Sequence, residues 1–228
     1  MQAVILAAGE GSRLRPFTDN LPKPMVNVSG KPILERTLDI LPDEIEEVVL
    51  IVGYKKEKII EHFGDEYRRI KITYAEQKER KGTYDALLCA EPFLKKGFFL
   101  LLQGDELYHP FDLKRCVESE ELAALVIETE HPERFGICIP DENDYVVKII
   151  EKPTDAPGNL ASIGAFLLHT DIFKMSKFAS EAIPGEYVLA EHISKWVEEV
   201  KMKMIRATFW YTISSHEDVY IADKFLGM

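Results

Sequence analysis

Apolar runs alternate with amphipathic segments through the first half of the chain, at lengths typical of strands and helices. Apolar runs predict strands at residues 3–6, 47–52 and 98–102, and a further strand is predicted at residues 70–74. Apolar side chains at helical spacing predict helices at residues 33–41, 56–63 and 84–90. Pro32 and Pro42 bracket the first helix, and Gly64 ends the second. This alternation predicts a parallel sheet that is covered by helices on both faces.

The pattern changes in the second half of the chain, where strand-like runs follow one another with little helix between them. These runs lie at residues 122–128, 136–140 and 146–150. Helices, a late strand and a closing helix are then predicted at residues 170–179, 188–200, 203–211 and 217–225. We therefore predict an α/β fold in a single domain over residues 1–228, with a mixed, mostly parallel sheet and an antiparallel elaboration in its second half. Such sheets bind ligands beyond the carboxyl ends of their strands.

The composition is that of a globular protein. Hydrophobic residues make up 46% of the chain and charged residues 29%, which excludes a disordered or membrane-embedded class. The longest apolar runs, such as residues 98–102, are too short to cross a bilayer, and no basic stretch typical of a signal peptide precedes residues 3–8. Cys89, Cys116 and Cys138 have no paired spacing, so we expect neither a disulfide framework nor a zinc site, and a cytoplasmic location.

The net charge of −11 disfavours broad electrostatic attraction to nucleic acid or to anionic membranes. An anionic ligand must therefore be bound by a local cluster of positive groups. Arg13, Arg15 and Lys23 form such a cluster close to the first predicted strand. The charge thus points to a small anionic ligand held near the amino terminus.

The segment GEGSRL at residues 9–14 directly follows the first predicted strand. It is not a dinucleotide fingerprint, because Leu14 occupies the third glycine position, and no Gly-Lys-Ser/Thr follows to make a P-loop. Two glycines still let the backbone turn sharply and point several N–H groups at one anion, and Arg13 adds a forked donor suited to phosphate. A plain β-turn with surface arginines is the alternative.

Two prolines, Pro22 and Pro24, flank Lys23. They restrict the backbone on both sides of the lysine, so its ammonium group is expected at a set place rather than free in solvent. A cation placed in advance is useful where charge must be stabilised during a reaction. The strand, the glycine turn, Arg13 and Lys23 together favour a catalytic phosphate site over a structural turn.

The run LAAGEGSRLRPFTDNLPKPM at residues 6–25 closely resembles the signature of the sugar-1-phosphate nucleotidylyltransferases. The resemblance continues at QKERKGT (77–83), LLQGD (101–105), RFGI (134–137) and IEKP (150–153), and so spans most of the chain. It implies a Rossmann-like nucleotidyltransferase fold, dependence on Mg²⁺ and release of pyrophosphate. It also implies a nucleotide-binding half at about residues 1–110 and a sugar-phosphate-binding half at about residues 111–228.

The resemblance implies a set of nucleotide-binding residues and three catalytic ones. The implied nucleotide-binding residues are Leu6, Ala8, Gly9, Gly11, Ser12, Arg13, Gln77 and Gly82. The implied catalytic residues are Arg13, Lys23 and Asp105. The Gln77 amide can both donate to and accept from a pyrimidine edge, which favours UTP or dTTP, although a surface glutamine in a charged loop is the alternative.

Asp105 follows an apolar strand, where an α/β sheet binds its ligands, and it is the expected Mg²⁺ ligand. An aspartate that merely starts a turn is the alternative there. On the sugar side, the resemblance implies that Gly136, Glu151 and Lys152 bind the sugar phosphate. An exposed Glu-Lys pair before a turn is the competing interpretation of the last two residues.

One position departs from the family pattern, which reads Trp-x-Asp-Ile-Gly-Thr and uses its Asp as a second metal ligand. Here the segment is WYTISS, so Thr212 stands at the Asp position. A hydroxyl is a weaker Mg²⁺ ligand than a carboxylate. Asp105 and the phosphates could hold the metal alone, Glu106 or Asp218 could substitute, or turnover could be lost.

The predicted function is Mg²⁺-dependent transfer of a nucleoside monophosphate from an NTP, UTP or dTTP, to a sugar 1-phosphate, by in-line attack on the α-phosphorus. One alternative is a CTP-dependent cytidylyltransferase acting on phosphocholine, inositol phosphate or a similar phospho-alcohol. A second is a nucleotide-binding regulator without turnover. The expected partners are the NTP and the sugar 1-phosphate, with no nucleic acid and no membrane, and a homo-oligomer stays open.

Overall fold

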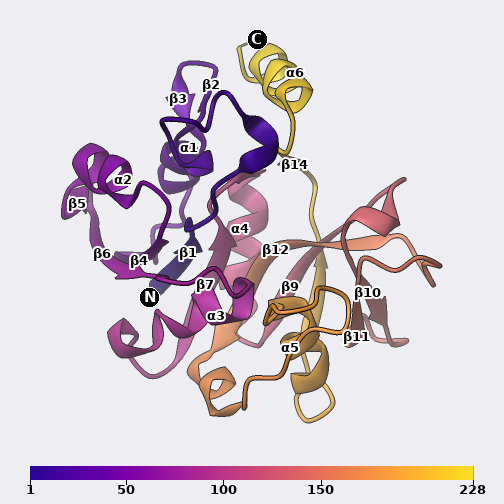
Figure 1. Ribbon diagram of the computed structural model, residues 1–228. Helices are drawn as coiled ribbons and strands as arrows, with labels where there is room; N and C mark the ends of the chain where they lie inside the picture. Colours follow the sequence, from indigo (N-terminus) through magenta and orange to yellow (C-terminus); the bar gives the residue numbers. More distant parts are fainter. Residues whose placement is uncertain (228) are drawn as a thin grey trace.

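Strand β1 (Gln2–Leu6) is the centre of the main sheet, because all five of its residues are apolar or neutral and are buried. The computed structural model describes residues 1–227 and places β1 between two parallel neighbours, β4 (Glu47–Val52) and β7 (Phe98–Gln103). Strand β6 (Ile70–Glu76) continues the parallel order beyond β4, and the short β5 (Glu66–Tyr67) closes that edge. The four parallel strands therefore end at one edge of the sheet (Figure 1).

Helices cover both faces of this sheet (Figure 1). On one face lie α1 (Ile33–Asp39), α2 (Lys56–Phe63) and α4 (Pro110–Val117), which share an apolar cluster with Ala3 and Ile5 of β1. On the other face lie α3 (Thr83–Leu88) and α5 (Leu189–Trp196), which pack with Val4 and Leu6. The alternation of β1 side chains between the two clusters is what the period of a strand requires.

The second half of the chain extends the sheet with antiparallel strands. Strand β12 (Leu160–His169) pairs antiparallel with β7, with β9 (Ala123–Glu128) and with β10 (Gly136–Pro140). Strand β10 also pairs with β11 (Val146–Glu151), and β13 (Lys203–Arg206) runs parallel to β9. The predicted mixed sheet with an antiparallel elaboration is confirmed.

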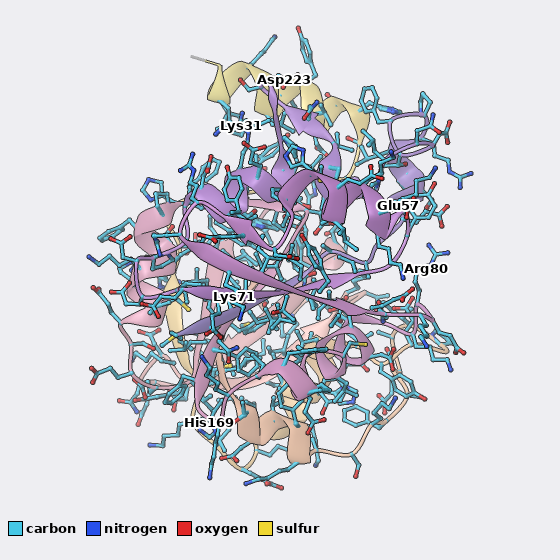
Figure 2. All side chains as sticks on the ribbon, turned by 90° about the vertical axis from the view of Figure 1, so that its left-hand side faces the viewer. Lys31, Glu57, Lys71, Arg80, His169 and Asp223 are labelled. Carbon is cyan, nitrogen blue, oxygen red and sulfur yellow. The ribbon has the colours of Figure 1, made fainter. Side chains whose placement is uncertain are left out.

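Two small sheets and the last helix form a third apolar cluster beside the glycine turn. The pairs are β2 (Asn27–Val28) with β3 (Lys31–Pro32), and β8 (Glu106–Tyr108) with β14 (Trp210–Thr212). Helix α6 (His216–Leu226) packs on them, and Asp223 accepts a hydrogen bond from the Ser29 amide. Figure 2 shows Asp223 and Lys31 at this same end of the molecule. The carboxyl-terminal helix thereby steadies the segment that follows the glycine turn.

Several predicted elements are corrected by the structure. The helix predicted at residues 170–179 is only a short 3-10 helix at Thr170–Lys174, and the predicted strand 203–211 is two strands, β13 and β14, in different sheets. Strand β12 and helix α4 were not predicted. The remaining short 3-10 helices are Ser12–Leu14, Lys23–Met25, Glu91–Phe93 and Pro132–Arg134.

Two of the three cysteine side chains lie in the apolar core. Cys116 and Cys138 are buried and Cys89 is half-buried, and all three are free thiols. Burial raises the pKa of both Cys116 and Cys138 to about 12, so these two thiols are unreactive at neutral pH. Each helix within residues 1–227 is too short or too polar to cross a bilayer.

A buried carboxylate joins α4 to the segment that leads into β14. Asp112 accepts hydrogen bonds from the Thr208 amide (2.7 Å), the Thr208 hydroxyl (2.9 Å) and Arg115 Nη2 (2.7 Å). Burial alone would raise the pKa of Asp112, but these hydrogen bonds outweigh it and lower the pKa below the usual value. The charged carboxylate therefore stabilises the position of β14.

We expect Asp112→Asn to lower the free energy of unfolding by about 2–3 kcal/mol at neutral pH, because it replaces a charged acceptor inside a buried network. Since the folded-state pKa is lowered, the carboxylate contributes fully above its unfolded value of about 3.9. Its contribution is lost as the pH falls through the folded pKa, so the gap between variant and parent should close below about pH 4. Urea unfolding measured from pH 7 to pH 3 checks this.

Asp43→Asn is the matched control, because the Asp43 carboxylate also pairs with an arginine, Arg69, but its side chain is 99% exposed. An exposed pair of this kind contributes less than about 1 kcal/mol. Equal losses for the two variants would contradict the assigned role of Asp112.

Candidate active site

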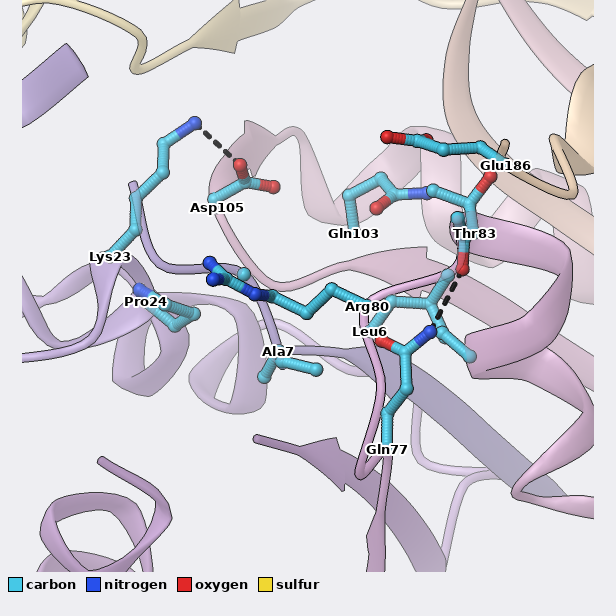
Figure 3. A pocket seen from close by; sticks show the side chains of 14 residues that line it. Leu6, Ala7, Lys23, Pro24, Gln77, Arg80, Thr83, Gln103, Asp105 and Glu186 are labelled. Carbon is cyan, nitrogen blue, oxygen red and sulfur yellow. Dashed lines mark hydrogen bonds and ion pairs between the residues drawn. The ribbon is translucent and has the colours of Figure 1, made fainter. Parts of the chain in front are cut away.

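The carboxyl ends of the parallel strands form the floor of a cavity of about 260 Å³ (Figure 3). The register pairs Leu6 of β1 with Gln103 of β7, and the Gly104 amide donates to the Leu6 carbonyl at 2.9 Å. A Cβ atom on Gly104 would lie 3.0 Å from that carbonyl, which is closer than most Cβ contacts in proteins. Glycine at position 104 therefore lets the residue after it, Asp105, stand beside the glycine turn.

Every residue assigned from the sequence to catalysis, nucleotide binding or sugar-phosphate binding lines this cavity or one of two adjoining cavities. The central cavity is lined by Leu6, Ala8, Gly9, Lys23, Gln77, Gly82 and Asp105. A second cavity, of about 210 Å³, is lined by Gly9, Gly11, Ser12, Arg13, Lys23 and Asp105. A third, of about 270 Å³, is lined by Gly136, Glu151 and Lys152. Their roles remain predictions, but the fold brings the whole set together.

The glycine turn is shaped by its contact with Lys23. Gly11 has φ of 68° and precedes the 3-10 helix Ser12–Leu14. A Cβ atom on Gly11 would lie 2.6 Å from the Lys23 Cβ, so both the positive φ and the close approach require glycine. The loop and the lysine are therefore packed as one unit.

Lys23 and Asp105 form an ion pair at the junction of the central and second cavities. Lys23 Nζ lies 2.5 Å from Asp105 Oδ2, and their side chains are 14% and 28% exposed. Arg13 lines the second cavity and has an exposed side chain, and no residue within 1–227 pairs with its guanidinium group. The site thus holds one cation that is neutralised by the protein and one that is open to a ligand.

Arg15, expected in the same positive cluster, does not line these cavities. Its guanidinium group pairs with Glu10 at 2.5 Å and with Asp19 at 3.7 Å. The local cluster of positive charge at the cavities is therefore Arg13 and Lys23, joined by Arg80 from another loop.

The two acids considered as replacements at Thr212 have different environments. Asp218 caps α6, accepting hydrogen bonds from Ser214 and Ser215, so its carboxylate is used by the fold. Glu106 accepts from the Thr212 hydroxyl at 3.0 Å, while its Oε2 is buried without a partner among the described residues. Burial, followed by the Asp105 charge, raises the pKa of Glu106 well above its usual value. Only Glu106 therefore offers a spare carboxylate oxygen next to Asp105.

Gln77 is buried against the loop that it begins. Its Nε2 donates to the Gly82 carbonyl at 3.0 Å and to Asp85 Oδ2 at 3.3 Å. Both Nε2 hydrogen atoms are thus used within the protein, and the contact of Gln77 with a base stays a prediction. The Oε1 atom, to which no residue within 1–227 donates, remains as an acceptor for a base N–H group.

The segment before α5 lies between the central cavity and the third cavity. The Gly82 φ is 98°, and a Cβ atom there would lie 2.5 Å from the Tyr187 carbonyl. The Tyr187 amide donates to the Lys81 carbonyl at 2.7 Å, and the Leu189 amide donates to the Thr83 hydroxyl at 2.9 Å. These contacts place Glu186 between the two cavities, both of which it lines.

Sequence reasoning missed four polar residues that line the central cavity, which are Arg80, Thr83, Gln103 and Glu186. Arg80 and Thr83 lie inside the motif QKERKGT and Gln103 inside LLQGD, so the recognised residues beside them could have indicated them. Glu186 lies in an irregular segment that only the docking onto residues 81–84 brings to the site. Figure 3 shows Gln103, Thr83 and Glu186 grouped on one side of the cavity, opposite Lys23 and Asp105.

The third cavity carries a buried acid. The Glu151 side chain is 13% exposed, and burial raises its pKa, only partly offset by the Lys152 ammonium 3.7 Å away. A Cβ atom on Gly136 would lie 3.1 Å from Glu151 Oε2. Glycine at 136 therefore makes room for the carboxylate that faces this cavity.

Comparisons with known proteins agree with this arrangement. A family model described as nucleotidyl transferase matches residues 2–227. The UTP–glucose-1-phosphate uridylyltransferase AglF of Haloferax volcanii is 42% identical over 200 residues, covering 85% of this chain and 82% of AglF. The bifunctional protein GlmU of Methanocaldococcus jannaschii is 34% identical over 99% of this chain, which spans 54% of the length of GlmU.

A solved structure supports the fold. The chain superposes on UDP-glucose pyrophosphorylase complexed with UDP-glucose with a TM-score of 0.85, at 22% identity and over 99% of this chain and 98% of that one. At this level of identity the similarity concerns the fold alone. It includes both the parallel half and the antiparallel elaboration.

We expect Gly82→Ala to destabilise the protein by about 2–3 kcal/mol, because it adds a backbone clash with Tyr187 to the cost of a positive φ. Gly30→Ala is the control, since Gly30 has φ of 80° but nothing within 4 Å of an added Cβ. The control should lose only about 1 kcal/mol. Thermal unfolding of both variants measures the difference, and equal losses would mean that the contact with Tyr187 is not tight.

Proposed function

Because this chain belongs to the nucleotidyl transferase family, we propose that it transfers a uridylyl or thymidylyl group from UTP or dTTP to a sugar 1-phosphate. Glucose 1-phosphate is the first candidate acceptor, as in the name of the relative that is 42% identical. One observation carries the proposal: three cavities meet at the strand ends, with Lys23 and Asp105 at one junction and Gln103 and Glu186 at the other.

We assign each of the two substrates to different cavities. We assign the nucleoside and its phosphates to the central and second cavities, formed by the half of the chain up to about residue 110, and the sugar phosphate to the third. Gln103 lines both the central and third cavities, so the two substrates would meet beside it. The sugar phosphate oxygen can then attack the α-phosphorus in line, and pyrophosphate leaves.

The charged residues position and stabilise the phosphates. The turn at Gly9 and Gly11 offers backbone N–H groups, and Arg13 offers a forked donor, toward the triphosphate. Lys23, at the junction, would contact the α-phosphate and the attacking sugar phosphate. Because the packing against Gly11 fixes the Lys23 side chain in advance, no reorganisation is needed when charge develops on the phosphate.

Mg²⁺ is the metal that we propose for this site, and the donor set suits it. Asp105 offers a partly exposed carboxylate at the cavity, and the adjacent Glu106 has a buried carboxylate oxygen without a partner among the described residues. Mg²⁺ takes one or two carboxylates and completes its shell with phosphate oxygens and water. Bound there, it would neutralise charge on the phosphates. No cluster of three or more acidic, histidine or cysteine ligands occurs within residues 1–227.

On the sugar side, Glu151 is placed to accept hydrogen bonds from sugar hydroxyls and Lys152 to bind the sugar phosphate. Burial of the Glu151 carboxylate makes an unpaired state costly, so a hydroxyl-rich ligand would satisfy it. This chemistry favours a sugar over a phospho-alcohol without several hydroxyl groups. We also place the reaction in the cytoplasm, which the three free thiols support.

We expect Lys23→Ala to lower kcat by roughly 10²–10³ while leaving the fold intact, because it removes one pre-placed donor to the reacting phosphates. Arg13→Ala and Asp105→Ala should show losses of similar size. Pyrophosphate release with UTP and glucose 1-phosphate measures the effect. Lys31→Ala is the control, since Lys31 also pairs with a carboxylate at 2.5 Å, that of Asp39, but outside these cavities. Normal turnover by folded Lys23→Ala protein would refute its role.

A panel of five NTPs and several phosphorylated acceptors tests the substrate class. We expect kcat/KM for UTP or dTTP with a sugar 1-phosphate to exceed that of every CTP, ATP or GTP reaction by at least about tenfold. Turnover confined to CTP with phosphocholine or inositol phosphate would instead identify a cytidylyltransferase. Tight NTP binding without pyrophosphate release from any acceptor would identify a regulator.

A further inference from the structure

A second group of ion pairs lies at the outer rim of the central cavity. The Glu10 carboxylate, between the two glycines of the turn, binds two guanidinium groups at once. Its Oε1 lies 2.5 Å from Arg15 Nη2, and its Oε2 lies 2.5 Å from Arg80 Nη1. Glu10 therefore joins the glycine turn to the loop that follows Gln77.

Only one of the two arginines lines the cavity. Arg80 does so together with Lys23 and Asp105, whereas Arg15 points to Glu10 and Asp19. Figure 3 shows the Arg80 side chain lying across the cavity, above Leu6 and Ala7, with its guanidinium group toward Lys23 and Pro24. Figure 2 shows Arg80 at the edge of the molecule, and its side chain is 57% exposed.

The charges of this group favour an exchange of partners. The Arg80 hydrogen bond, followed by that of Arg15, lowers the pKa of Glu10, so the carboxylate is charged at neutral pH. Glu10 divides its single negative charge between two guanidinium groups, so Arg80 has no carboxylate of its own. A triphosphate carries more charge than a carboxylate and accepts paired hydrogen bonds from a guanidinium group, so it competes well for Arg80.

We propose that Arg80 binds the β- and γ-phosphates of the incoming nucleotide, and that Glu10 holds its guanidinium group over the cavity until the nucleotide arrives. This rests on the function proposed above and names a phosphate-binding residue outside the glycine turn. The ends of the Arg80 loop are fixed by backbone hydrogen bonds from Gln77 to Val52 (2.9 Å) and from Tyr187 to Lys81 (2.7 Å). The exchange therefore needs rotation of the side chain and no movement of the sheet.

This arrangement has a consequence for selectivity. The loop that carries Gln77, assigned to the base, also carries the arginine assigned to the outer phosphates. A nucleoside monophosphate would engage Gln77 without reaching Arg80, whereas a triphosphate would engage both. Arg80 should therefore contribute to the preference for triphosphates over monophosphates.

Isothermal titration calorimetry with UTP and UMP at a fixed Mg²⁺ concentration tests the proposal. We expect Arg80→Ala to raise the Kd for UTP by about tenfold or more, because a charge-assisted contact is lost, and to change the Kd for UMP less than about twofold. Arg80→Lys should recover part of the UTP affinity. Arg15→Ala is the matched control, because it removes the other guanidinium group on Glu10, and it should leave both affinities within about twofold.

Glu10→Gln provides a test that a merely structural role would not pass. Removing the competing charge should tighten UTP binding by about threefold, and this gain should vanish in the Arg80→Ala background. Circular dichroism melting confirms that each variant is folded, and Arg80→Gln replaces Arg80→Ala if the latter is not.

An unchanged UTP affinity in Arg80→Ala, or equal losses for UTP and UMP, would overturn the role of Arg80 while leaving the proposed function standing. Failure of the parent protein to bind any nucleoside triphosphate would overturn the proposed function, and the role of Arg80 with it. Persistence of the Glu10→Gln gain without Arg80 would show that Glu10 acts on the phosphates directly, against the exchange.

Discussion

The close pairing of β1 with β7 is the constraint on which the site depends. Leu6 and Gln103 are register partners, and the backbone of Gly104 reaches back to the Leu6 carbonyl at 2.9 Å. Both strands are packed on both faces, so a one-residue slip would exchange the side chains that enter the two apolar clusters. The packing of these two strands therefore sets the distance between the glycine turn, which follows β1, and Asp105, which follows β7.

The same closeness explains how an acidic chain holds a phosphate site. With 39 acidic against 28 basic residues, the protein has no general attraction for anions. Lys23 and Arg80 are instead kept at the cavity by carboxylates, those of Asp105 and Glu10. For Arg80, substrate binding would exchange the Glu10 carboxylate for a phosphate, which costs less than bringing a bare cation out of water. Asp105 would stay in place as the proposed Mg²⁺ ligand.

Features that depend on local runs of residues were predicted from the sequence. Most features that depend on contacts between distant segments were not. Three of the four parallel strands were found because each is a nearly continuous apolar run, and the site residues because they lie in contiguous motifs. Strand β12 was missed because Ser162 and Gly164 interrupt its apolar pattern, although it pairs with three other strands. Residues 203–211 were read as one strand because no break in polarity marks the point where the chain passes between sheets. Glu186 reaches the site only through backbone contacts with residues 81–84.

The environment of Thr212 also depends on a distant contact, a cross-strand pair, and so could not be predicted from the sequence. Thr212 of β14 lies opposite Glu106 of β8, and the two side chains share a hydrogen bond of 3.0 Å. Because burial and the Asp105 charge already raise the pKa of Glu106, a carboxylate at 212 would place another acid in a space with little solvent. A neutral donor at 212 is therefore the natural partner of an acid at 106. The two positions form one hydrogen-bonded pair across the ladder, which a sequence taken one position at a time does not show.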